Sequence, residues 1–166
     1  MTMQRFKFIA LGSALIGAGI IAASVATATA GSGFSGTQLA LGHFGTINVK
    51  ADKDDKWDLF LKTKDRTDIG MDKLNLAPGG YSGWHTHRGP VFVTIKSGSI
   101  VRSSISVSGC AVTTYSAGET FIEDANMVHS VRNASSTEPA EFFAIQMRPE
   151  GTPGRVDAPA PTVSCP

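Results

Sequence analysis

Strong charge of either sign is missing from this 166-residue sequence. Lys and Arg number 15 and Asp and Glu 14, so the formal net charge is +1, and only 17% of residues are charged. Proteins that bind nucleic acid or an anionic membrane surface usually carry a clustered positive excess, so we expect neither partner here. The hydrophobic share of 42% argues against a wholly disordered chain.

Several catalytic and helical patterns are also absent. The sequence has no G-x-S-x-G, no Walker phosphate loop and no dinucleotide-binding glycine pattern, so serine-hydrolase, nucleotide and nicotinamide chemistry are unsupported. After residue 30, apolar residues nowhere hold the i, i+3, i+4, i+7 spacing of an amphipathic helix over three turns. We therefore expect an all-β fold.

A series of short extended runs is present instead. About nine segments rich in Val, Ile, Thr and Phe are separated by Gly, Pro and Asn turns. This spacing predicts a β-sandwich or barrel over residues 46–150. A flexible segment at 31–45 is expected before it and an irregular Pro-rich tail at 151–166 after it. The predicted strands are Thr46–Lys50, Trp57–Lys62, Ile69–Leu76, Val91–Lys96, Ile100–Val107, Val112–Tyr115, Thr120–Glu123, Val128–Arg132 and Ala140–Met147.

Residues 1–30 have the order of a secretory signal. Arg5 and Lys7 precede an uncharged apolar run, and small residues then end in Ala28-Thr29-Ala30, an A-x-A cleavage pattern. We expect cleavage after Ala30, a secreted or periplasmic protein, and no stable membrane insertion once the leader is removed. An uncleaved membrane anchor is the alternative, since the apolar run is just long enough to span a bilayer.

Two cysteines, Cys110 and Cys165, are the only pair available for a disulfide. An exported protein meets an oxidising compartment, which would join them and pin the tail to the domain. Two free thiols are the alternative.

Four histidines are few, and three of them carry a pattern. His85 and His87 are two residues apart in a strand-like segment, so their side chains project to the same face and could grip one metal ion. His129 lies in a second strand-like segment. A vestigial hydrogen-bonded pair is the alternative for His85 and His87. His43 lies outside this pattern, and we expect it on the surface.

The spacing around these histidines resembles the two motifs of the cupin family. The first motif is a Gly, five residues, H-x-H, three or four residues, a Glu, six residues and a Gly. The second is a Gly, five residues, P-x-G, two residues, His, three residues and Asn. The sequence matches every spacing, with the first motif read at Gly79, His85, His87, Val91 and Gly98, and the second at Gly118, Asp124, Asn126, His129 and Asn133. Small secreted single-domain cupins with a G-W-H-T-H first motif are the most similar group.

The resemblance implies a cupin double-stranded β-helix, or jelly-roll barrel, with the three histidines converging inside. It also implies a metal site, from which the sequence departs at one position: Val91 stands where the family has a metal-binding Glu. Three imidazoles without a carboxylate favour Zn, Fe, Cu or Ni as the divalent ion. Glu119 and Glu123 are candidates to supply the missing carboxylate, with Glu119 expected to be exposed.

Two functions remain open on these residues. One is a small-molecule metalloenzyme of the dioxygenase or isomerase type, with no catalytic residue assigned. The other is a non-catalytic cupin that binds a small ligand such as a sugar or an organic acid. A homodimer formed through an outer sheet face is a further expectation. Among the remaining residues, we expect Trp84 to pack, Arg88 to be a solvated loop cation, and Gln146 to point into the barrel.

Overall fold

The computed structural model describes residues 28–51 and 57–165. The expected signal peptide falls almost wholly on residues 1–27, which lie outside the described residues. Within the described part, every regular element is a β-strand. No helix there is long and apolar enough to cross a lipid bilayer. The all-β expectation is confirmed.

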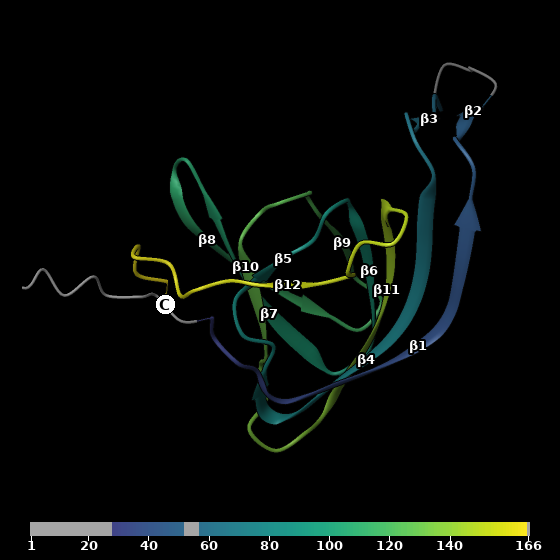
Figure 1. Cartoon of the computed structure of the whole chain (residues 1–166). Helices are drawn as coiled ribbons and strands as arrows, with labels where there is room; N and C mark the ends of the chain where they lie inside the picture. Colours follow the sequence, from purple (N-terminus) through teal and green to yellow (C-terminus); the bar gives the residue numbers. More distant parts are fainter. Residues whose placement is uncertain (1–27, 52–56, 166) are drawn as a thin grey trace, which may run out of the picture.

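Twelve strands occur in the described residues, and ten of them form one antiparallel sheet that curls into a nearly closed barrel (Figure 1). Strand order along the main path is β12-β5-β10-β4-β11-β6-β9, with β1 added beside β4 and the β7–β8 pair beside β10. The bounds are β1 Ser32–Phe44, β2 Asn48–Lys50, β3 Phe60–Lys62, β4 Thr67–Tyr81, β5 His85–Thr86, β6 Val91–Ser97, β7 Ser99–Ser106, β8 Gly109–Ser116, β9 Thr120–Glu123, β10 His129–Asn133, β11 Ala140–Pro149 and β12 Val156–Asp157.

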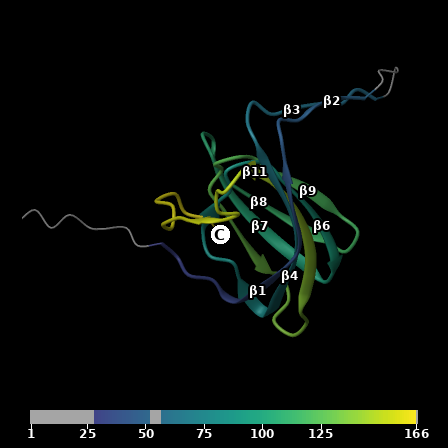
Figure 2. The same cartoon turned by 45° about the vertical axis from the view of Figure 1, so that its right-hand side comes forward.

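The remaining two strands, β2 and β3, form a separate hairpin. It projects away from the barrel at one end of the long β1–β4 ribbon, and both views show it standing clear of the other strands (Figures 1 and 2).

Alternation along β6 shows how the sequence builds the barrel wall. Val91, Val93 and Ile95 are buried, while Phe92 and Thr94 between them face outward. This period of two is what a strand with one buried face requires. The inward side chains join a core made of Leu76, Val91, Val93, Ile95, Ile100, Phe121, Val131, Ala140, Phe142 and Ala144. Val91 is 1% exposed, so the prediction that it is a core residue is confirmed.

The segment expected to be flexible, 31–45, is instead the strand β1 over Ser32–Phe44. Its Gly- and Ser-rich start has low intrinsic β-propensity, but β1 pairs with β4 along almost its whole length. Backbone pairing with a long partner strand outweighs local propensity here. Sequence composition alone does not show that partner.

The second motif turns sharply at Asn126, where φ is +61°. The cupin pattern has Gly at this position, and Asn is among the few other residues that readily adopt a left-handed conformation. The turn brings the Asn126 amide within 2.8 Å of the His87 carbonyl oxygen, to which it donates a hydrogen bond. The departure from the motif therefore preserves the conformation and links the two motifs.

Asn133, the last residue of the second motif, holds the barrel end together. It is buried, and its Nδ2 donates to the carbonyl oxygens of Leu76, Ala77 and Glu138 at 3.2, 3.1 and 2.8 Å. One side chain thereby satisfies carbonyl groups from two segments distant in sequence.

Residues 150–165, which we call the C-terminal strap, cross the open end of the barrel (Figure 1). Their short strand β12 pairs with β5, and Ala158 donates from its amide to the Trp84 carbonyl oxygen at 2.9 Å. The strap ends at a disulfide between Cys165 and Cys110 at the start of β8, with Cα atoms 5.6 Å apart. The predicted bridge is confirmed.

We expect the Cys165→Ser variant to be less stable than the wild type. The bridge spans 55 residues, and removing it returns loop entropy to the unfolded chain, at a cost of about 4 kcal/mol in the chain-entropy treatment. Thermal unfolding under non-reducing conditions measures the effect, with Ser164→Ala as the matched control. An unchanged melting temperature in Cys165→Ser would show that the strap is held by its other contacts.

Candidate metal centre

The three motif histidines meet inside the barrel. His85 lies in β5 and is the cross-strand partner of His129 in β10, while His87 follows β5 directly. Their exposed fractions are 5%, 0% and 6% for His85, His129 and His87. One ring nitrogen from each lies within 4.8 Å of the others, so the predicted convergence is present.

Each of these rings donates from Nδ1 to a backbone carbonyl oxygen. His85 bonds to Gly83 at 3.0 Å, His87 to Gly154 at 2.5 Å and His129 to Met127 at 2.9 Å. A carbonyl oxygen only accepts, so the proton of each neutral ring is on Nδ1. The lone pair is then on Nε2. This hydrogen bonding is the arrangement that orients histidines for metal binding.

A carboxylate completes the cluster from a neighbouring strand. Glu123, 5% exposed, lies in β9 with its two carboxylate oxygens 3.0 Å from Nε2 of His129 and 3.2 Å from Nε2 of His87. Glu123 is the direct cross-strand partner of Val91. Directly opposed residues share a face of the sheet, so the carboxylate enters the same space as a Glu at position 91 would.

This arrangement suits a positive charge at its centre. The lone pairs of His87 and His129 face carboxylate oxygens across about 3 Å, and Nε2 of His129 is buried with no hydrogen-bond partner. Two ligands that each lie about 2.1 Å from one ion are roughly 3.0 to 3.4 Å apart at octahedral or tetrahedral angles. The observed separations match that spacing, so three histidines and Glu123 fit a metal ion.

Burial and neighbouring charges set the pKa values at the site. Burial raises the pKa of Glu123, but the nearby rings of His129 and His87 outweigh burial and lower that pKa below its usual range. The carboxylate is therefore ionised. The pKa of His85 is lowered to about 3, first by burial and then by the charges of His129 and Arg155. A neutral His85 keeps its lone pair available to a metal.

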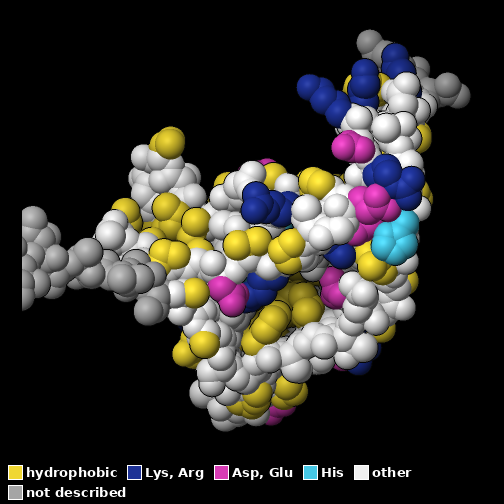
Figure 3. All heavy atoms as spheres, viewed as in Figure 1, with side chains coloured by type: hydrophobic (Ala, Val, Ile, Leu, Met, Phe, Trp, Pro, Cys, Tyr) yellow, Lys and Arg dark blue, Asp and Glu magenta, His cyan; other side chains and the backbone are white. Residues whose placement is uncertain are grey.

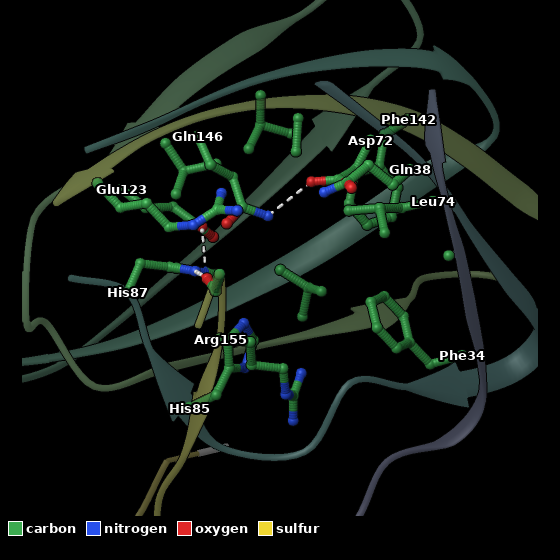
Figure 4. Close-up of a pocket in the computed structure, with 17 residues that line it drawn as sticks. Phe34, Gln38, Asp72, Leu74, His85, His87, Glu123, Phe142, Gln146 and Arg155 are labelled. Carbon is green, nitrogen blue, oxygen red and sulfur yellow. Dashed lines mark hydrogen bonds and ion pairs between the residues drawn. The ribbon is translucent and has the colours of Figure 1, made fainter. Parts of the chain in front are cut away.

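A cavity of about 290 Å³ opens beside the histidines. The space-filling view shows a hollow with apolar side chains at its floor and charged side chains at its rim (Figure 3). In the close-up, His85, His87 and Arg155 lie on one side and Asp72 on the other (Figure 4). The lining residues are Phe34, Gly36, Gln38, Asp72, Leu74, His85, His87, Val91, Val93, Glu123, Val131, Phe142, Ala144, Gln146, Arg148, Gly154 and Arg155.

Of the other residues named in the sequence analysis, some line this cavity and others lie on the surface. Gln146 lines the cavity as expected, while Glu119 and Arg88 are exposed. Trp84 is half-buried and does not line the histidine cavity.

His43 is 58% exposed in its side chain and pairs with Asp68 at 2.7 Å on β4. Glu150 lies close to this pair, but its carboxylate is engaged by Arg66. The expectation that His43 lies on the surface, outside the site, is confirmed.

Comparison with known families agrees with this geometry. Residues 73–146, which contain both histidine motifs and Glu123, match the family model described as the cupin domain. This part of the chain, residues 73–146, is a cupin domain. The match begins within β4 and ends at Gln146 in β11, so the cupin domain includes the barrel strands that hold the histidines, while β1 and the strap lie outside it.

Several solved structures are similar to this chain. Peruvianin-I, a cysteine peptidase from Thevetia peruviana latex, is 22% identical over 55% of this chain and 56% of its own, with a TM-score of 0.48. An oxalate oxidase in complex with glycolate is 22% identical over 53% and 45%, with a TM-score of 0.47. Oxalate decarboxylase from Bacillus subtilis is 13% identical over 55% and 27%, with a TM-score of 0.47.

The chain thus spans between about a quarter and a little over half the length of these structures. A search of curated protein sequences finds no match.

Sequence reasoning missed Asp72 in β4 and two contributors to the site on the strap. The Gly154 carbonyl oxygen accepts from Nδ1 of His87, and Arg155 lines the cavity. Gly154 and Arg155 lie 67 and 68 residues after His87, inside a segment whose Pro content indicates only irregular structure. The one signal that could have pointed to them is the disulfide, which brings the tail back to the barrel.

We expect Glu123→Gln to weaken metal binding by at least about tenfold, because it removes the negative charge facing two of the histidines. Competitive titration with a chromophoric chelator measures the affinity. Glu119→Gln, a matched change on an exposed carboxylate near the same strand, should leave it unchanged. Equal affinities for the two variants would exclude Glu123 from the metal centre.

Proposed function

We propose that this protein is a metal-dependent cupin acting on a small organic molecule, with one ion held by His85, His87, His129 and Glu123. The single observation that carries the proposal is the shared orientation of the three imidazoles. Each Nδ1 is tied to a carbonyl oxygen, and each Nε2 is left to face a common centre.

The donor set narrows the metal to a divalent transition ion. Three imidazole nitrogens suit Zn, Fe, Cu or Ni, as the sequence indicated. The Glu123 carboxylate extends this range to Mn, because a carboxylate oxygen is a ligand that Mn accepts readily. Bound there, such an ion acidifies a water molecule or polarises a carbonyl group.

The remaining residues of the cavity favour an enzyme over a passive binding module. Gln146 donates from Nε2 to Asp72 Oδ2 at 2.8 Å, and Asp72 lies across the cavity from the histidines (Figure 4). Burial raises the pKa of the Asp72 carboxyl. A carboxyl group with a raised pKa at a ligand cavity is suited to accept or return a proton. Val91, Val93 and Val131 add apolar side chains to the lining of the same cavity.

We further propose that the protein is exported. The Cys110–Cys165 disulfide is consistent with an oxidising compartment, and the leader composition is that of a signal peptide. Thr29 refines the cleavage point: its Oγ1 accepts from the Trp84 amide at 2.7 Å, and its amide donates to the Ala158 carbonyl oxygen at 3.1 Å. Cleavage after Ala30 would remove both contacts, whereas cleavage after Ala26-Thr27-Ala28, also an A-x-A pattern, would keep them.

Purified wild-type protein should contain about one equivalent of transition metal by elemental analysis. His129→Ala should contain almost none, because it removes the most deeply buried ligand. His43→Ala is the matched control and should keep the wild-type content, because His43 lies on the surface. Metal-free wild-type protein that also takes up no Zn, Fe, Cu, Ni or Mn would contradict the proposal.

We expect the exported chain to begin at Thr29. Intact-mass spectrometry of protein recovered from the exported fraction measures the cleavage point directly. The mass of a chain that begins at Gly31 would support cleavage after Ala30. The mass of the full chain with its leader would favour the membrane-anchor alternative.

A further inference from the structure

The C-terminal strap supplies the cavity with a cation. Among the described residues it contributes Gly154 and Arg155 to the lining, and the next two residues, Val156 and Asp157, pair with Thr86 and His85. The strap is therefore attached directly to the strand that carries a metal-binding histidine. Its disulfide holds the far end to β8.

Two hydrogen bonds hold the Arg155 guanidinium in place. Nε donates to Asp157 Oδ1 and Nη2 donates to the Ser82 carbonyl oxygen, both at 2.6 Å. The guanidinium carbon also lies 5.8 Å from the centre of the Phe34 ring. Nη1 is buried and has no hydrogen-bond partner among the described residues. A buried donor without an acceptor is costly, so this group is suited to an acceptor brought by a ligand.

Arg155 is also close to the metal centre. In the close-up it lies beside His85, and its charge contributes to the lowered pKa of that histidine (Figure 4). A guanidinium and a divalent ion on the same side of one cavity repel each other. A negatively charged ligand group between them removes that repulsion.

The charges around the cavity favour an anion as well. The lining holds two arginines, Arg148 and Arg155, and two carboxylates, Asp72 and Glu123. The two positive and two negative charges of these side chains cancel. A divalent ion adds two positive charges. Asp157, on the outer side of Arg155, offsets one of them and leaves the loaded site positive.

Asp72 and Gln146 offer acceptors instead of donors. Gln146 uses its amide nitrogen on Asp72, and its Oε1 is buried without a partner. The Asp72 carboxylate and Gln146 Oε1 can each accept a hydrogen bond from a hydroxyl group of a ligand. The cavity volume of about 290 Å³ lies at the lower end of the range of about 300–1,000 Å³ for ligand pockets, so the ligand is small.

We propose that the cavity binds a short hydroxy acid, with its carboxylate on Arg155 next to the metal ion and its hydroxyl group toward Asp72 and Gln146. This inference rests on the proposed metal site and names the ligand class of that site. A neutral sugar would leave the Arg155 donor and the positive charge unmatched. The strap thereby acts as the specificity-determining segment.

Three probes of nearly equal size separate these contributions. Lactate carries the carboxylate and the hydroxyl group, lactamide keeps the hydroxyl group without the charge, and propionate keeps the charge without the hydroxyl group. Their dissociation constants are measured by calorimetry on metal-loaded wild-type protein and on Arg155→Gln and Arg155→Lys. Arg132→Gln changes an exposed arginine and serves as the control. The metal content of each sample is determined in parallel.

We expect lactate to bind at least about tenfold more tightly than lactamide, and Arg155→Gln to weaken lactate by about 10- to 100-fold with little effect on lactamide. Propionate should bind more weakly than lactate, Arg155→Lys should recover part of the lactate affinity, and Arg132→Gln should match the wild type. Equal affinities of metal-loaded protein for lactate and lactamide would overturn this inference and leave the proposed function standing. So would an unchanged lactate affinity in Arg155→Gln. Samples that hold no metal would overturn the proposed function.

Discussion

Three hydrogen bonds from imidazole Nδ1 atoms to backbone carbonyl oxygens determine what the interior of this barrel can do. They place the proton of each neutral ring away from the centre and leave three Nε2 lone pairs directed inward. The carbonyl groups belong to Gly83, Gly154 and Met127, so three separate backbone segments must be positioned before the site exists. A metal ion is the simplest charge that reconciles these lone pairs with the ionised Glu123 beside them.

The strap makes the proposed metal centre depend on a part of the chain outside the cupin match. Gly154 orients His87, Arg155 borders the cavity, and Ala158 bonds to the segment before His85. The Cys110–Cys165 bridge fixes the end of the strap. In the proposed function, disulfide formation and metal binding are linked physically, since an unbridged tail is less constrained to supply the Gly154 carbonyl oxygen.

The barrel fold and the three histidines could be predicted from the sequence because both depend on short-range patterns. Period-two alternation identified most of the strands, and the two motif spacings identified His85, His87 and His129. The role of Glu123 needed the register between β6 and β9, which pairs Glu123 with Val91 and which spacing alone does not show. The strand over Ser32–Phe44 and the contacts of the strap depend on partners distant in sequence, so composition indicated flexibility where pairing creates order.

The most direct test of the central claim is a crystal structure of the metal-loaded protein, with anomalous scattering recorded at the absorption edge of the bound element. We predict one anomalous peak between His85, His87 and His129, within bonding distance of all three Nε2 atoms and of a Glu123 carboxylate oxygen. A peak elsewhere on the molecule, or an ordered hydrogen-bonded water in place of the ion under metal-saturating conditions, would contradict the account.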